Sequence, residues 1–179
     1  MKKLNLNEKG FTLIELLAVI VILAIVMVLA SQSVLPFMRN ASKDSFVIEA
    51  NGVIDAASNA ISLYNVGQLD LTYEKDKDNN DIINKEKFTK TVEGGKTTGY
   101  CFTLQYLVDE GLYSLKANKI DKNNYGGYVE AKKEGNSFTY TLNFRNKDFY
   151  VEKFNSGAVS ADNVKELDAT GKAIATQCP

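Results

Sequence analysis

An apolar run near the start of the chain constrains the fold more than any other feature. Leu16 to Ala30 is fifteen apolar residues in a row, and Phe11 to Glu15 extends the segment to twenty. Twenty residues of helix measure about 30 Å, the thickness of the hydrocarbon core of a bilayer. The run therefore predicts a membrane-spanning helix. One acid, Glu15, lies close to its N-terminal end.

The segment before this run, MKKLNLNEKG, carries an excess of positive charge, from Lys2, Lys3 and Lys9 against Glu8. This excess predicts a cytoplasmic N-terminus and a C-terminal part on the other side of the membrane. Two alternatives are a cleaved secretory signal, which would end in small residues near Ala30 to Ser33, and a plain single-span anchor. Neither gives a role to Glu15, and an acid inside a membrane span is costly enough to indicate a function.

Composition removes several classes of function. The chain of 179 residues contains no His and has a net charge of −1. Without His there is no Ser–His or Cys–His pair for nucleophilic catalysis, and the commonest metal ligand is missing. Lys and Arg are scattered, which argues against a nucleic-acid surface. An enzyme using carboxylates or Lys stays open, but no motif favours it, and we expect no catalytic residue, cofactor or metal.

The stretch KGFTLIELLAVIVILAIV resembles the class III signal of type IV pilins and pseudopilins. In that family a short charged leader ends in Gly and is followed by a Phe-Thr-Leu-Ile-Glu sequence and a hydrophobic helix. The resemblance covers about twenty residues. It implies cleavage between Gly10 and Phe11 by a prepilin peptidase and N-methylation of Phe11. Glu15 becomes the fifth residue of the mature chain, where the family carries an acid.

Cleavage would create a positive amine at Phe11, one helical turn from the carboxylate of Glu15. Each charge is costly alone in an apolar medium, and a pair offsets much of that cost. The resemblance implies that the partner of Glu15 is the terminus of a neighbouring subunit, which sets the stagger between subunits. The alternative is that Glu15 reaches the cytoplasmic headgroups and pairs with nothing.

The helix is expected to continue beyond the membrane as an amphipathic segment. Pro36 should kink or loosen it, because proline removes a backbone hydrogen bond. Beyond Pro36 an apolar stripe recurs at spacings of three and four residues, at Val47, Ala50, Ile54, Ala57, Ile61 and Tyr64, widened by Phe46, Val53 and Ala60. Gly67 is placed to cap the helix end. The stripe should pack on a sheet rather than form a free coiled coil.

Strand patterns dominate the rest of the chain. Strands are expected at Leu69–Tyr73, Phe88–Val92, Gly127–Lys132, Phe138–Phe144 and Phe149–Phe154, with at least the last three in an antiparallel meander. Thr103 to Gly111 predicts a short helix capped by Thr103, and Asp162–Leu167 a weak one.

Asp76, Asp78 and Asn80 match the first ligands of a calcium loop. However, Asp81 and Lys87 stand where that loop needs Gly and Glu, which favours a solvated loop.

Cys101 and Cys178 are the two cysteines of the chain. A head outside the cytoplasm favours a disulfide between them, and two free buried thiols are the alternative. With no His nearby in the sequence, the pair is a poor zinc site. The resemblance adds that the C-terminal loop of many pilins is pinned in this way.

Together these patterns predict an α+β pilin "lollipop", in which a long N-terminal α-helix packs on an antiparallel β-sheet. The expected parts are a leader (1–10), a transmembrane or filament-core helix (11–35), its amphipathic half (36–66) and a globular head (67–179). The resemblance implies a type IV pilus subunit that polymerises with copies of itself for adhesion, motility or aggregation. Its further partners would be prepilin peptidase, the pilus assembly machinery, the membrane and an unknown surface receptor.

The same resemblance implies a single-pass membrane protein that later becomes part of an extracellular pilus. The alternatives are a pseudopilin of a type II secretion or competence system, a minor pilin with an adhesive or DNA-uptake role, and a membrane-anchored enzyme.

Overall fold

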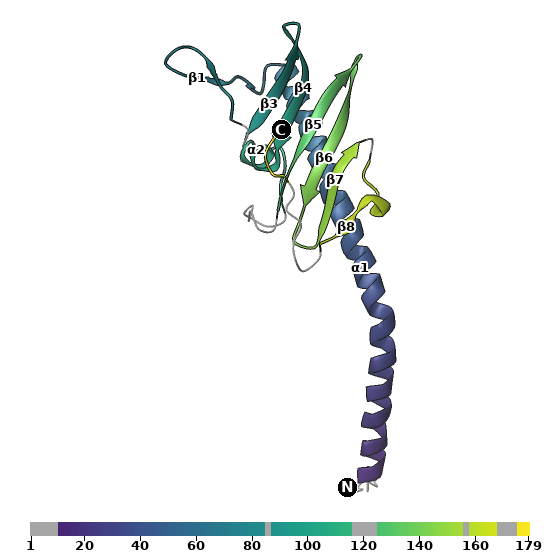
Figure 1. Ribbon diagram of the computed structural model, residues 1–179. Coiled ribbons are helices and arrows are strands. Elements are labelled where there is room, and N and C mark those ends of the chain that lie inside the picture. The colour runs from purple at the N-terminus through teal and green to yellow at the C-terminus, as the bar shows by residue number, and fades with distance from the viewer. Residues whose placement is uncertain (1–10, 85–86, 116–124, 156–157, 168–174) are drawn as a thin grey trace, which may run out of the picture. The chain divides into compact units, whose positions relative to one another are not determined.

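The computed structural model describes residues 11–84, 87–115, 125–155, 158–167 and 175–179. It shows an α+β arrangement, in which the long helix α1 (Leu13–Asn65) precedes a six-stranded antiparallel sheet (Figure 1). Two compact units divide the chain, Met1–Ser42 and Lys43–Pro179, and α1 contributes residues to both. The predicted fold class is therefore confirmed, while the four proposed domain boundaries stay predictions.

The helix α1 ends as the sequence predicts. Gly67 adopts a φ of +73°, and its N–H donates to the carbonyl of Tyr64 at 3.0 Å. The N–H of Gln68 donates to the carbonyl of Leu63 at 2.9 Å, so the last turn closes with a glycine in the left-handed region. Pro36 lies inside α1, with helix assigned on both sides of it. The kink expected at Pro36 stays a prediction.

The sheet is a meander of sequential strands in the order β3-β4-β5-β6-β7-β8, each antiparallel to the next. The strands are β3 (Phe88–Glu93), β4 (Lys96–Thr103), β5 (Gly126–Glu134), β6 (Ser137–Arg145), β7 (Phe149–Asn155) and β8 (Lys165–Glu166). A separate hairpin of β1 (Glu74–Lys75) and β2 (Asp81–Ile82) precedes them. Short turns join most neighbours, as an antiparallel meander allows.

The helix α2 (Leu104–Asp109) connects β4 to the segment before β5. Its N-cap is Thr103, whose hydroxyl accepts a hydrogen bond from the N–H of Tyr106 at 3.2 Å. Gly111, with a φ of +69°, follows the last turn. The predicted short helix and its cap are confirmed, and Leu104 and Leu107 are buried in the core.

The core lies between the second half of α1 and one face of the sheet. Phe46 is fully buried, and its ring stacks on Phe144 at 5.2 Å between centroids. Asn51 fixes a later segment to the helix, because its side chain accepts from the N–H of Val159 at 2.7 Å and donates to the carbonyl of Val159 at 3.0 Å. The predicted stripe faces the core, with these helix residues buried: Phe46, Ala50, Val53, Ile54, Ala56, Ala57, Ala60 and Ile61.

Gly52 leaves room for a tyrosine against α1. A Cβ at this position would come within 3.0 Å of the ring of Tyr113. The hydroxyl of Tyr113 donates to the carbonyl of Glu49 at 2.9 Å. Burial raises the pKa of Tyr113 far above its usual range. The tyrosine therefore stays neutral and holds the segment after α2 against the helix.

Three sequence-based expectations were wrong or incomplete. Leu69–Tyr73 forms no strand; Leu71 is buried in the core while the chain stays irregular. Asp162–Leu167 forms a 3-10 turn and then β8, because β8 pairs with β7 and the N–H of Leu167 donates to the carbonyl of Asp148 at 2.8 Å. The strand β4 was not predicted at all, although Gly94 and Gly95, both at positive φ, form its hairpin turn with β3.

Candidate functional site

The first turn of α1 holds Glu15 through a reciprocal cap with Thr12. The backbone N–H and the hydroxyl of Thr12 both donate to Oε2 of Glu15, each at 2.9 Å. The N–H of Glu15 lies 3.3 Å from the hydroxyl oxygen of Thr12, which accepts from it. This is the arrangement of a capping box, which satisfies N–H groups that have no partner inside the helix. Both bonds from Thr12 reach Oε2, and no donor among the described residues binds Oε1.

Sequence reasoning assigned Glu15 but not Thr12. The signal was present, since a Thr followed three residues later by Glu before an apolar run is the signature of such a cap. Phe11 precedes the cap and is 87% exposed. Gly10 and the rest of the leader lie outside the described residues. The cleavage between Gly10 and Phe11, the methylation of Phe11 and the charge pairing of Glu15 therefore stay predictions.

The apolar half of α1 is exposed all round. The large apolar side chains between Leu13 and Leu35 are at least 48% exposed. The helix contains a window of eighteen residues with a mean hydropathy of 3.2 and none of it buried, so by length and composition α1 can cross a membrane. An apolar surface of this size is not stable in water, which indicates a lipid or protein environment for this half. Both environments suit a helix that is apolar on every face.

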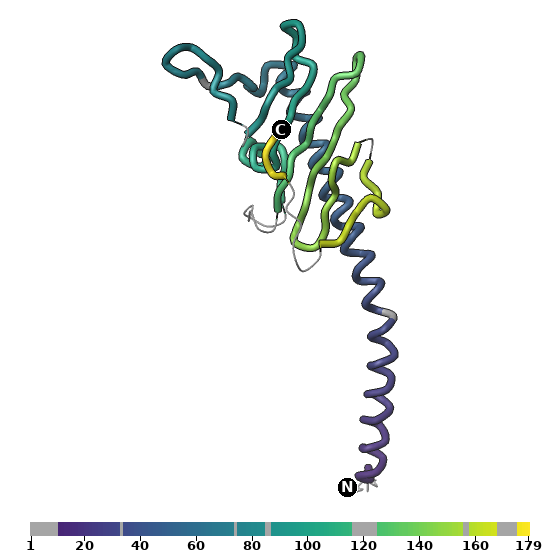
Figure 2. Tube along the Cα trace, viewed as in Figure 1, coloured from purple at the N-terminus to yellow at the C-terminus, as the bar shows by residue number. Residues whose placement is uncertain are grey.

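A disulfide joins Cys101 of β4 to Cys178, with their Cα atoms 5.9 Å apart. The predicted bridge is confirmed, and both cysteines are buried beside Tyr128. It holds residues 175–179 against the outer face of β4 and β5 (Figure 2). A Cβ at Gly126 would lie 2.7 Å from Cγ2 of Thr176, so the tail approaches β5 where a glycine makes space.

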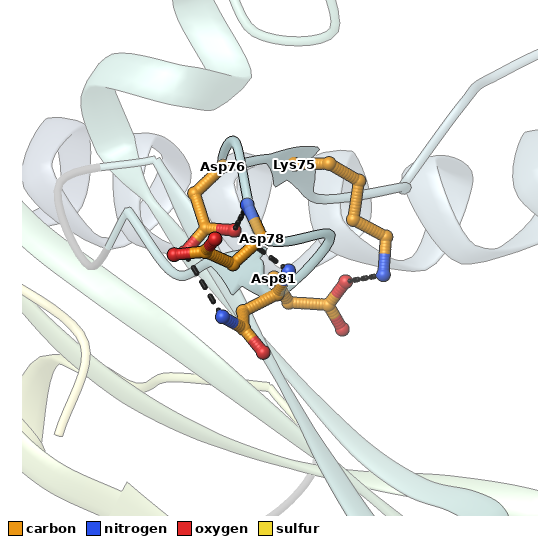
Figure 3. Close-up of polar contacts among 5 residues, drawn as sticks. Lys75, Asp76, Asp78 and Asp81 are labelled. Atoms are coloured by element: carbon orange, nitrogen blue, oxygen red, sulfur yellow. Dashed lines mark hydrogen bonds and ion pairs between the residues drawn. The ribbon is translucent and has the colours of Figure 1, made fainter.

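The acidic hairpin of β1 and β2 binds two of its carboxylates, those of Asp76 and Asp81, internally (Figure 3). Oδ1 of Asp76 accepts from the N–H of Asp78 at 2.9 Å and of Asn80 at 2.8 Å. Oδ2 of Asp76 accepts from the side chain of Asn80 at 3.1 Å, and Lys75 pairs with Asp81 across the hairpin. The bonds from Asn80 hold the pKa of Asp76 below its usual range. Asp76 thus closes a turn, and the solvated-loop interpretation stays a prediction.

Residues 5–31 match the family model described as the prokaryotic N-terminal methylation motif, which is the class III signal of type IV pilins and pseudopilins. The match covers the end of the leader, Phe11, the Thr12–Glu15 cap and the apolar run, and it leaves out the sheet. No curated protein and no solved structure matches the chain. The N-terminal helix therefore carries the resemblance to a known family. That family is one of structural subunits rather than enzymes.

Proposed function

We propose that this chain, which carries the class III signal of type IV pilins and pseudopilins, is the precursor of a type IV pilus subunit. Prepilin peptidase would cut between Gly10 and Phe11, and the new amine at Phe11 would be methylated. The apolar half of α1 would anchor the mature chain in the membrane until the chain enters a surface filament of identical copies. The observation that carries this proposal is the exposed apolar helix whose first turn, within the motif, holds Glu15 in a cap with Thr12.

Two features of Glu15 support its role in assembly. Its Oε2 is held by Thr12, so the carboxylate has a fixed position at the first turn of the helix. Oε1 binds no donor among residues 11–84 and the other described parts of the chain, so it would be open to the methylated amine of a neighbouring subunit. Cations and anions paired in an apolar medium offset each other's desolvation, whereas unpaired ones do not. A subunit would therefore be favoured in the filament at the stagger that brings the amine to Glu15.

The exposed apolar surface supports the same conclusion from packing. In lipid, the side chains of the apolar half of α1 would contact acyl chains on all sides. In a filament core, the same side chains would contact the helices of other copies and lose no hydrogen bond on transfer. The free-energy difference between the helix in lipid and the helix in the filament would then depend on side-chain packing and on the charge pair of Glu15. The charge pair at one end of the helix would therefore set the axial stagger between subunits. The apolar surface would allow the helix to transfer from the membrane to the filament.

A pseudopilin is the second candidate, because it carries the same motif. The head favours a pilus subunit, since the disulfide between Cys101 and Cys178 holds the C-terminal tail on the sheet, as in many pilins. Such a tether suits a surface exposed to shear outside the cell.

Electron microscopy of cells with and without the gene, joined to mass spectrometry of the isolated subunit, tests the proposal. We expect long filaments that vanish with the gene and a subunit that begins with methylated Phe11. Short periplasmic or envelope-bound filaments with the same terminus would identify a pseudopilin. A subunit that retains Met1, or one that begins after Ala30, would contradict both.

A further inference from the structure

The strand β3 stands at one edge of the sheet, and its outer side faces away from β4. The carbonyl of Lys87 accepts from the N–H of Thr103 at 3.0 Å, so this carbonyl points toward β4, whereas the N–H of Lys87 donates to the carbonyl of Asn84 at 3.0 Å. Thr89 continues this pattern opposite Cys101. Because bonding alternates along an antiparallel strand, the backbone groups of Phe88 and Lys90 point to the open edge. Such an edge is a template for another strand.

Tyr73 covers this edge at its middle. Its hydroxyl oxygen accepts a hydrogen bond from the backbone N–H of Lys90 at 2.6 Å. The ring of Tyr73 stacks on Phe88, with centroids 5.3 Å apart and planes 9° from parallel. Leu71, two residues earlier, is fully buried and fixes the segment to the core. The irregular segment before β1 therefore lies beside β3 and fills a bonding position that a strand would otherwise take.

The side chain of Lys90 strengthens the same contact. Its ammonium lies 5.5 Å from the ring centre of Tyr73, 5.9 Å from that of Phe88 and 5.2 Å from that of Tyr64. Partial burial lowers the pKa of Lys90, and nearby Asp70 and Asp81 oppose that shift. The cation is attracted by the ring faces, so it holds Tyr73 to α1 and β3 together. We call the contact between Tyr73 and Lys90 the edge clasp.

The remainder of the edge is protected differently. A bulge between Thr91 and Val92 interrupts the regular pattern, and Val92 is 57% exposed. At the opposite edge, β8 is two residues long and pairs only with Phe149 and Tyr150 of β7. The rest of β7 has no further strand beside it among the described residues, but Lys153, at a φ of +48°, interrupts its extended backbone. The regular part of β3, from Phe88 to Thr91, is thus the longer uninterrupted edge, and the clasp closes it.

We propose that the edge clasp prevents β3 from pairing with β3 of a second copy of this chain. The second copy is the partner because copies held in one membrane by α1 reach high local concentrations with their heads on the same side. Each copy presents the same edge, so opening of the clasp offers two matching strands to each other. The clasp keeps sheet pairing from competing with contacts made through the helix. This inference rests on the proposed membrane anchoring by α1 and not on the proposed filament.

The test uses the full chain in detergent micelles. Tyr73→Phe keeps the ring contacts and removes the acceptor of the Lys90 N–H, while Tyr73→Ala removes both. Hydrogen–deuterium exchange at the Lys90 amide should be roughly fivefold to tenfold faster in Tyr73→Phe, the effect of one hydrogen bond. Exchange of the amides in the inner strands β5 and β6 should not change. An unchanged Lys90 amide would overturn the clasp.

Pairing is measured by bismaleimide cross-linking at Val92→Cys, a reaction that spares the native disulfide. The matched control is Lys165→Cys on β8, at the other edge of the sheet. We expect dimers through residue 92 to rise severalfold in the Tyr73→Ala background and less in Tyr73→Phe, with no rise through residue 165. Faster exchange without more dimers would overturn the guarding role. An equal rise at both positions would show general association and would overturn it too.

Discussion

The hydroxyl and the backbone N–H of Thr12 both donate to Oε2 of Glu15, and each bond is 2.9 Å long. This relationship changes how the acid in the apolar helix is understood. Glu15 is not an isolated charge before assembly, because its own chain supplies two donors. The cap lowers the free-energy penalty of keeping the carboxylate near lipid. It also fixes the direction in which the second carboxylate oxygen points.

Thr12→Val should impair assembly without affecting insertion. Valine has the shape of threonine but lacks the hydroxyl, so Glu15 loses one of its two donors and its fixed orientation. We expect filament yield to fall severalfold, while Thr12→Ser, which keeps the hydroxyl, assembles nearly normally. Mass spectrometry of the N-terminus in both variants separates a processing defect from an assembly defect. Equal filament yields from the valine and serine variants would show that the hydroxyl positions nothing of importance.

Glu15→Gln should have a larger effect than Thr12→Val. Glutamine keeps an oxygen that accepts from Thr12 but carries no charge, so the amine that the proposed cleavage creates at Phe11 would find no counter-charge. We expect normal membrane insertion, assayed by fractionation, and loss of most filaments, counted by electron microscopy. Glu15→Ala should behave like Glu15→Gln. Wild-type filament numbers from both would show that the carboxylate has no role in assembly.

The sequence predicted features that depend on neighbouring residues. The extent of α1, its buried stripe and the caps at Thr103 and Gly67 all follow from local spacing, and each is confirmed. The edge clasp could not be predicted, because Tyr73 and Lys90 are seventeen positions apart with no periodic pattern between them. The strand β8 was not predicted for a related reason. Its two residues become a strand only because β7 lies beside them, and this contact overrides a weak helical preference.

Phe46→Ala should destabilise the head strongly. Its ring is fully buried, stacks on Phe144 and lies 5.9 Å from the ring of Phe149. Removing a buried aromatic side chain lowers the free energy of unfolding by about 3–5 kcal/mol. Ile48→Ala is the matched control on the same helix, because Ile48 is 73% exposed and should change stability by less than about 0.5 kcal/mol. Denaturant unfolding followed by near-UV circular dichroism measures both. Similar midpoints for the two variants would contradict this core assignment.

Cys101→Ser with Cys178→Ser should lower the free energy of unfolding by about 4 kcal/mol, given the 77-residue separation that the bridge closes. The loss arises because the unfolded chain becomes less restricted. A reducing agent should destabilise the native protein by a similar amount and leave the double variant unchanged. A reductant effect that persists in the double variant would mean that the bridge is not its cause.

Tyr106 should make the head less stable at high pH. It is buried between Phe88 and Phe102, and burial raises its pKa from 10.0 to about 12. The unfolded chain would lose this proton near pH 10, whereas the folded chain keeps it until about pH 12. The folded state therefore binds more protons in this window, and stability falls as pH rises through it. Below pH 10 the contribution is constant.

Tyr106→Phe keeps the ring and removes the titrating group, so unfolding of this variant should depend less steeply on pH between about 10 and 12. It should not become independent of pH, because burial also raises the pKa of Tyr73, Tyr100, Tyr113, Tyr125 and Tyr128. Denaturant midpoints at a series of pH values give the slope of stability against pH for the native protein and for Tyr106→Phe. Tyr150→Phe is the matched control, since Tyr150 is only partly buried, on β7 beside the edge strand β8. Equal slopes for Tyr106→Phe and Tyr150→Phe would show that the buried hydroxyl contributes nothing to the alkaline loss of stability.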